Sequence, residues 1–283
     1  EARRITDLDD AGFARELARR FSRHLGTFEV VGPRWCYPLS MQLATDYAAP
    51  RVALVGDAAH VVHPLAGLGF NLGLRDVAAL AETVATINRL LPQIGPVDLV
   101  IVTGDLTEHG TPEEYDRFKM LMADLDLPYR VLPGNHDRRE PMRESFADAQ
   151  WMPRTGPLDW QIDFEDFAVV GLDSLTESAA HGTLEPATLS FLTDALSGLG
   201  DKPAIVGFHH PPFAVGIKAM DAQNLHDADS LGTALSLHSG QVRLVCGHLH
   251  RSIAVLFSGS LCQVCPGTSH AVTLDQRANA GNS

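Results

Sequence analysis

Four short apolar runs, each ending in a polar cluster, constrain the fold of this chain more than any other feature of its sequence. Near-continuous Val, Ile and Leu in such runs is typical of strands that are buried on both faces of a sheet. Helical patterns such as PEEYDRFKMLMADLD (112–126) lie between some of the runs, which predicts an α/β fold with helices covering the sheet. The runs with their polar ends are VDLVIVTGD (97–105), PYRVLPGNHD (128–137), PAIVGFHHPP (203–212) and QVRLVCGHLH (241–250).

The polar ends of these runs predict a metal centre, because functional groups of open α/β sheets collect at the carboxyl ends of the strands. A lone histidine after a strand is usually an ordinary loop residue, but five of the 13 histidines fall at these ends. Carboxylate, amide and imidazole groups are ligands for Zn, Mn or Fe, and the absence of cysteine from the set argues against a structural zinc site. The candidate residues are Asp105, Asn135, His136, His209, His210, His248 and His250.

The overall charge and hydropathy exclude several classes of partner. A net charge of −13 argues against a nucleic-acid polymer or an anionic membrane surface as partner. No apolar run approaches the roughly 18 residues of a membrane span, and no signal peptide is evident, so we expect a cytoplasmic protein. A small anionic substrate remains compatible if a metal supplies positive charge, and a homo-oligomer stays open. The four cysteines show no paired zinc-site spacing, which favours reduced thiols in a core.

The ordered signature GD (104–105), GNHD (134–137), HHPP (209–212) and GHLH (247–250) resembles the calcineurin-like metallophosphoesterase superfamily. The segments GDLTEHGTPEEYDRF, LPGNHDRRE and PGTSHAVTLD are most similar to its branch that hydrolyses cyclic nucleotides and glycerophosphodiesters. The resemblance covers about residues 77–276 and implies a layered α/β sandwich. It also implies metal-dependent hydrolysis of a small phosphodiester substrate.

By this resemblance, Asp105 would bridge two divalent ions, Mn, Fe or Zn. Asn135, His209 and His248 would complete one site, and His250 would belong to the other. His136 would act beside the phosphate as proton donor or charge stabiliser, while His210 would lie behind the ligands. A bridged pair of ions about 3.5–4 Å apart lowers the pKa of a bound water and neutralises phosphate charge during in-line attack.

The first part of the chain resembles a different family. Its segment YPLSMQLATDYAAPRVALVGDAAHVVHPLAGLGFNLGLRDVAALAE is similar to the carboxyl-terminal part of flavin-dependent hydroxylases of ubiquinone biosynthesis. In that family the matching motif contacts FAD; the corresponding positions here are Asp57, Pro64, Gly67, Gly69, Asn71, Gly73 and Asp76. No G-x-G-x-x-G unit for the ADP half of FAD occurs in the 283 residues, so we do not expect FAD binding.

The chain is therefore interpreted as a fusion of an incomplete α+β segment, residues 1–76, with a metallophosphoesterase domain, residues 77–283. The charge distribution agrees, since residues 1–85 carry 9 basic and 10 acidic groups, whereas the remainder carries 13 basic and 25 acidic groups. A glycine-containing loop is predicted for AAHVVHPLAGLGFNLG (58–73), and a helix that Pro92 closes is predicted for LRDVAALAETVATINRLL (74–91). We expect the join to lie in this helix, within RDVAALAETVATINRL. The alternatives are a fragment of an FAD-dependent monooxygenase and a catalytically inactive metal-binding module.

One element of the superfamily is missing: a first strand that ends in Asp-x-His and supplies two ligands. The segment RVALVGDAAH (51–60) contains Asp57, which precedes Asp105 by 48 positions. We therefore expect this segment to take the place of the missing strand. Asp57 is then a tentative surrogate ligand. His60 is not, because the Asp-x-x-His spacing does not send both side chains to one face of an extended segment. We therefore expect an impaired second metal site.

Overall fold

The computed structural model describes residues 70–268 without a gap, their side chains from residue 79 on, and six shorter pieces upstream. The chain divides into two compact units, Glu1–Gln42 and Leu43–Ser283. The sheets and helices of residues 70–268 belong to the second unit. Upstream, the described strands are β1 (Gln42–Leu43), β2 (Ala48–Ala49), β3 (Val52–Ala53) and β4 (His60–Val61).

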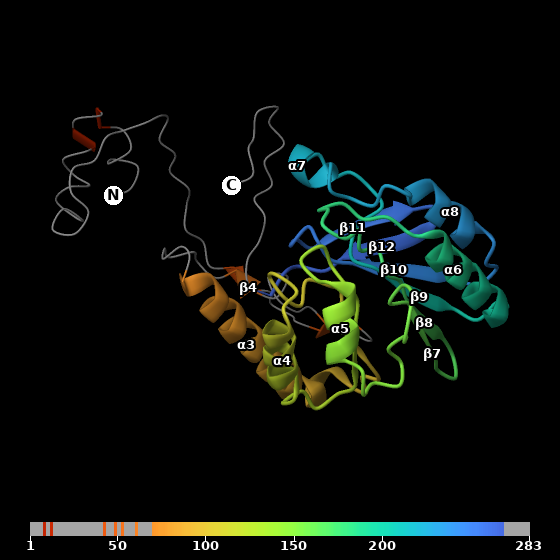
Figure 1. Cartoon of the computed structure of the whole chain (residues 1–283), viewed down its shortest axis with the longest axis horizontal. Helices are drawn as coiled ribbons and strands as arrows, with labels where there is room; N and C mark the ends of the chain where they lie inside the picture. The colour runs from red at the N-terminus through yellow and green to blue at the C-terminus, as the bar shows by residue number, and fades with distance from the viewer. Residues whose placement is uncertain are drawn as a thin grey trace. The chain divides into compact units, whose positions relative to one another are not determined.

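A six-stranded mixed sheet forms the larger part of the unit, with strand order β11-β12-β10-β9-β8-β7 (Figure 1). The four inner strands run parallel, and each outer strand is antiparallel to its neighbour. The bounds are β7 (Trp160–Asp163), β8 (Ala168–Gly171), β9 (Ala204–Gly207), β10 (Val242–Cys246), β11 (Ile253–Phe257) and β12 (Ser260–Val264). A separate parallel pair is made by β5 (Val100–Val102) and β6 (Tyr129–Val131).

Helices pack on both sheets and confirm the predicted α/β sandwich. Leu192 of α6 (Pro186–Leu199) and Leu231 of α8 (Ala228–Ser236) are fully buried in the core beneath the six-stranded sheet. A second core packs α3 (Phe70–Ile94), α4 (Pro112–Met122) and α5 (Arg139–Ser145) around β5 and β6. The short α7 (Lys218–Asp221) precedes α8. Figure 1 shows α3, α4 and α5 as one group, apart from α6 and α8.

The long helix α3 differs at both ends from the sequence-based expectation. The glycine-containing loop was expected to continue through Gly73, but the helix begins at Phe70. Pro92 was expected to close the helix, which instead continues to Ile94. Pro92 removes the one hydrogen bond that an N–H at this position would make to the carbonyl four residues earlier, and the helix ends two residues after it, so the disturbance stays in the last turn. No helix in the described part of the chain has the length and apolar character that crossing a membrane requires.

Two of the cysteines follow the expectation of reduced core thiols. Cys246 on β10 and Cys262 on β12 are fully buried and carry no disulfide, with their Sγ atoms 3.3 Å apart. Burial raises the pKa of the Cys246 thiol well above its ordinary value, which keeps this sulfur protonated. The Cys246 thiol is therefore poorly suited to bind a metal.

The start of α4 contains a complete capping box. Thr111 Oγ1 accepts a hydrogen bond from the Glu114 backbone N–H at 3.4 Å, and a Glu114 carboxylate oxygen accepts one from the Thr111 N–H at 3.0 Å. We predict that Thr111→Ala lowers the free energy of unfolding by about 1 kcal/mol, as loss of an N-cap typically does. Urea denaturation measures this effect. Thr233→Ala, which removes an exposed hydroxyl bonded within α8, is the control; equal losses in both variants would contradict the assignment.

Strand register brings the polar strand ends together. Val245 of β10 pairs with Gly207 of β9, so the histidines that follow these parallel strands emerge at the same sheet edge. The Gly247 N–H donates to the His209 carbonyl at 3.0 Å, which joins the two loops directly. Val102 of β5 pairs with Val131 of β6, which places the loops of Asp105 and Asn135 side by side in the same way.

Candidate metal centre

The loops that carry the predicted ligands have backbone conformations that few residues adopt. Asp105, His248 and His250 have positive φ angles of 54°, 69° and 49°. A left-handed conformation costs a residue with a side chain roughly 1–2 kcal/mol, and such strain clusters at functional sites. Three of the five described non-glycine residues with positive φ are thus predicted metal ligands.

Two glycines allow the ligand loops to approach one another. A Cβ atom on Gly134 would overlap the carboxylate of Asp105, and one on Gly104 would overlap the ring of His209. Gly104 also has a φ of +106°, which only glycine adopts without strain. The glycines of GD and GNHD are therefore required for the close contact between Asp105, His209 and the Asn135 loop.

Asp105 and His209 face each other at the centre of the site. Asp105 Oδ2 lies 3.2 Å from His209 Nε2, and Oδ1 accepts a hydrogen bond from the His136 N–H at 3.1 Å. His209 Nδ1 lies 2.7 Å from the Thr103 carbonyl oxygen and must donate to it. His209 Nε2 lacks a partner with hydrogen-bond geometry among the described residues, so the 3.2 Å approach is an ion-pair distance rather than a hydrogen bond. An Nε2 so oriented is suited to bind a metal.

Asp105 and His209 each favour the charged form of the other. Burial alone would raise the pKa of the Asp105 carboxyl, but the neighbouring His209 and His136 outweigh it and hold that pKa well below its usual range. Burial lowers the pKa of His209, whereas the Asp105 carboxylate raises it more, so the net direction is upward. A metal ion would therefore compete with a proton for Nε2 of His209.

Asn135 and His248 form the other half of the same site. His248 Nδ1 lies 3.0 Å from Asn135 Oδ1, and the ring centroids of His248 and His209 are 5.1 Å apart. Burial lowers the pKa of His248 to about 3, with a further contribution from His209, so the ring is neutral as a metal ligand must be. Asp105, Asn135, His209 and His248 thus converge as predicted. Two oxygens and two imidazoles fit Zn, Mn or Fe.

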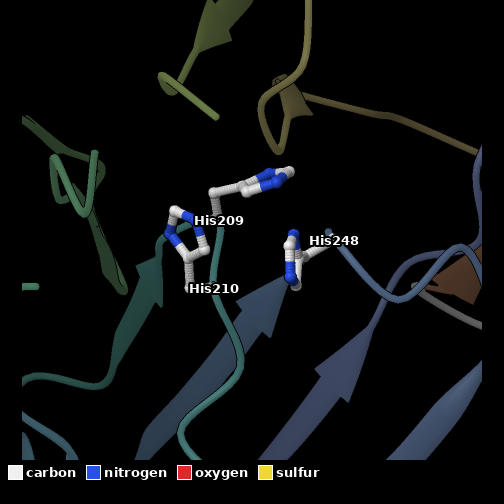
Figure 2. Close-up of side chains that lie close together, drawn as sticks. All are labelled: His209, His210 and His248. Carbon is white, nitrogen blue, oxygen red and sulfur yellow. The ribbon is translucent and has the colours of Figure 1, made fainter. Parts of the chain in front are cut away.

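The structure also brings His210 to this cluster. Ligand nitrogens of His209, His210 and His248 all lie within 4.8 Å of one another, and Figure 2 shows the three rings around one space. His210 is fully buried, and its Nδ1 lies 2.9 Å from the hydroxyl of Ser174. In the predicted place behind the ligands, the other ring nitrogen, Nε2, has no hydrogen-bond partner among the described residues.

His136 lies at the exposed side of the site, as a residue that meets substrate should. Its side chain is 43% exposed, whereas that of His209 is 2% exposed. His136 Nδ1 donates to the Glu108 carbonyl oxygen at 3.1 Å, which orients the ring and leaves Nε2 to carry or release a proton.

Asp137 is the main functional residue that the sequence did not reveal. Its fully buried carboxylate accepts hydrogen bonds from two loops and from α4. The donors are the N–H groups of Gly134 (2.9 Å) and Leu106 (3.2 Å), the Thr107 hydroxyl (3.0 Å) and the Tyr115 hydroxyl (3.1 Å). Tyr115 in turn accepts from the Arg138 N–H at 2.9 Å. Asp137 therefore fastens the loop of Asp105 to the loop of Asn135 and His136.

The structure describes only some of the predicted flavin-motif residues. Asp57, Gly67 and Gly69 lie outside the described residues, and of Asn71 only the backbone is described, in the first turn of α3. Val52–Ala53, the described part of the predicted surrogate strand, pairs antiparallel with β2, while β5 pairs with β6 alone among the described strands.

Two family models match the chain, in overlapping ranges. The model of calcineurin-like phosphoesterases matches residues 50–252, and that of an FAD binding domain matches residues 3–89. A ubiquinone hydroxylase of Rhodospirillum rubrum is 56% identical over 78 residues, 28% of this chain and 18% of that protein. The chain thus joins a segment of flavin-hydroxylase ancestry to a phosphoesterase.

Relatives over the larger part are named phosphodiesterases. A probable glycerophosphodiester phosphodiesterase of Arcobacter nitrofigilis is 36% identical over 203 residues, 71% of this chain and 73% of that protein. A 3',5'-cyclic adenosine monophosphate phosphodiesterase of Pseudomonas aeruginosa is 33% identical over 215 residues, 73% of this chain and 75% of that protein.

A solved structure agrees on the fold. A dimetal phosphatase of Danio rerio, 15% identical, superposes with a TM-score of 0.51 over 68% of this chain and 78% of that one. The family model covers well over half of the chain, and the observed strand ends carry that family's ordered signature. The chain therefore belongs to the calcineurin-like phosphoesterase family.

Proposed function

We propose that this protein hydrolyses small phosphodiesters, of the glycerophosphodiester or cyclic nucleotide type, with divalent metal ions held at the centre described above. The observation that carries the proposal is the convergence of Asp105, Asn135, His209 and His248, with His209 Nε2 lacking a hydrogen-bond partner in the described part of the chain. The names of the relatives from Arcobacter and Pseudomonas support the substrate class.

The chain's own residues divide the work of the reaction. When bound, divalent ions of this family polarise the phosphoryl oxygens and lower the pKa of the attacking water. Asp105, Asn135, His209 and His248 hold the metal, and the Thr103 carbonyl fixes the orientation of His209. His136 stands at the exposed side, where protonated Nε2 donates its proton to the leaving alkoxide.

We further propose that the metal centre is asymmetric. One site has the four described ligands, whereas the second rests on the shared Asp105, on His250 and on Asp57 as surrogate for the family's first-strand aspartate. The family-model match supports this reading, because it begins at residue 50 and takes in Asp57. The spacing of Asp57 and His60 argues against a second imidazole from that strand. The second ion is then held more weakly than the first.

Metal content measured together with hydrolysis tests this function. The full chain, freed of metal by a chelator and reloaded with Mn²⁺, is assayed on an aryl phosphodiester, a glycerophosphodiester and a 3',5'-cyclic nucleotide. We expect one tightly held ion per chain, a second that titrates at higher concentration, and turnover that follows the second. Full metal loading without hydrolysis of any of the three substrates would contradict the proposal and indicate a metal-binding module.

A flavin function is the alternative that the first segment raises, and we propose that it is not retained. The 283 residues contain no G-x-G-x-x-G unit, which in flavin hydroxylases binds the ADP half of FAD. The purified chain should therefore show no flavin absorbance and no binding of added FAD. Stoichiometric FAD in the purified protein would overturn this inference.

The role of His136 is tested by substitution. We predict that His136→Ala lowers kcat by about 10²–10⁴-fold, the usual contribution of a positioned general acid, while metal content stays unchanged. The matched control is His109→Ala, because His109 is also exposed and lies in the same region but bonds Glu114 at 3.1 Å. If His136→Ala retained full kcat, or if it lost its metal, the assignment of a proton donor would fail.

A further inference from the structure

The environment of Ser174 determines which nitrogen of His210 carries a proton. Ser174 Oγ lies 2.9 Å from His210 Nδ1 and also accepts the backbone N–H groups of His209, at 3.3 Å, and of His210, at 3.4 Å. A hydroxyl has one hydrogen to donate and two lone pairs with which to accept. Both lone pairs are engaged by the backbone, so the hydroxyl hydrogen is directed to His210 Nδ1. Nδ1 is then the acceptor, and the proton of the neutral ring is on Nε2.

The Nε2 edge of His210 faces the cluster. The opposite edge packs against Gly182, where an added Cβ atom would overlap the His210 Cγ and Nδ1. The ring centroid lies 4.8 Å from that of His209 and 4.9 Å from that of His248, and Figure 2 shows the three rings turned toward the same space. Nε2 is buried and has no hydrogen-bond partner among the residues that the structure describes.

A buried N–H donor without an acceptor costs about 1–3 kcal/mol, so its retention points to a group that binds there. Proximity alone would make His210 a third imidazole ligand of a metal ion. The Ser174 hydroxyl argues against that role, because a protonated Nε2 has no lone pair to give to a metal.

We propose that His210 is a substrate-contacting residue whose Nε2–H donates a hydrogen bond to an oxygen of the phosphate held at the metal centre. Ser174 is its positioning residue. The inference rests on the proposed function for the presence of phosphate, and it adds a specific acceptor site that the metal ligands do not supply. Neutral donors directed at phosphate oxygens position the substrate without competing for the ions.

The protonation of the ring is measured first, without any reaction. Long-range ¹H–¹⁵N spectra of the ¹⁵N-labelled metal-free chain, and of the Zn²⁺-loaded chain, distinguish the two neutral forms of His210. We expect the Nε2–H form in both states, and its loss in Ser174→Ala but not in the control Ser236→Ala, whose exposed hydroxyl donates to the Thr233 carbonyl. An Nδ1–H form in the wild-type chain would overturn the proposal.

Phosphate binding is measured next, on the Zn²⁺-loaded chain titrated with inorganic phosphate. His210→Asn keeps an amide near Ser174 but has no group at the position of Nε2, whereas His210→Gln places its amide nitrogen there. We expect phosphate affinity to fall about 10–100-fold in His210→Asn, the range for a hydrogen bond to a charged group, and to recover in part in His210→Gln. Zinc content should be unchanged in both variants.

These outcomes are independent of turnover. If the wild-type chain binds phosphate but hydrolyses no phosphodiester, the proposed function fails while the His210 contact stands. Equal phosphate affinity in wild type and His210→Asn would show that Nε2 does not meet phosphate. A loss of zinc in both variants would show that His210 is a metal ligand. Equal phosphate affinity or loss of zinc would each overturn the proposal.

Discussion

Replacing Asp105 with asparagine is expected to lower kcat/KM for phosphodiester hydrolysis by at least about 1000-fold, because under the proposed function its carboxylate would bridge metal ions that stabilise transition-state charge by several kcal/mol. Asparagine keeps the size of the side chain and an oxygen that accepts the His136 N–H. The negative charge that faces His209 Nε2 at 3.2 Å is lost, so both ions are expected to bind more weakly.

Metal analysis and kinetics on the same preparation check this prediction. The expected result is a metal content well below that of the wild type after dialysis, with activity that excess Mn²⁺ restores only in part. Asp148→Asn is the matched control, because Asp148 is an exposed aspartate after α5 and should retain both properties. Asp105→Asn with full metal content and turnover within about tenfold of wild type would show that the carboxylate does not bridge the ions.

The largest effect on stability is expected for Asp137→Ala. The substitution leaves the Leu106 and Gly134 N–H groups and the hydroxyls of Thr107 and Tyr115 without their buried acceptor. Each uncompensated donor costs about 1–3 kcal/mol, and because the four share one cavity their costs do not add, so we expect a loss of about 3–5 kcal/mol. Burial and the charge of Asp105 raise the pKa of Asp137 to about 6, so the carboxylate is ionised at neutral pH.

Urea denaturation of the metal-free chain measures this loss separately from metal binding. Tyr115→Phe removes a single donor from the same carboxylate and should cost about 1 kcal/mol, which makes it the graded comparison. In the folded Asp137→Ala protein, metal affinity should fall about 10–100-fold, as it does when groups that orient metal ligands are removed. A free energy of unfolding within about 1 kcal/mol of wild type would mean that Asp137 does not hold the two loops together.

The residues that meet at the strand ends could be predicted from the sequence. Asp105, Asn135, His209 and His248 were predicted to meet because each follows an apolar run, and the parallel register of β9 with β10 and of β5 with β6 brings them together. This prediction required only the direction of the strands. Buried strands have a strong local signature, so the architecture around them was accessible from composition and order alone.

Element boundaries and loop geometry were less accessible. The start of α3 at Phe70 and its end beyond Pro92 differ from the prediction, because tertiary packing of the helix overrides the local signals of glycine and proline. The positive φ angles of Asp105, His248 and His250 have no sequence signal, since aspartate and histidine adopt ordinary conformations in most loops.

The sequence by itself determined the α/β class and the family, because these depend on residue type and on order along the chain. The same pattern predicted the candidate metal ligands, which remain a proposal. Only the tertiary structure decided which groups support them. Tyr115 meets Asp137 across 22 positions, and Ser174 meets His210 across 36. The pairing of a buried donor with its acceptor is set by how helices and strands pack, and no local pattern encodes the partner of a hydrogen bond between distant loops.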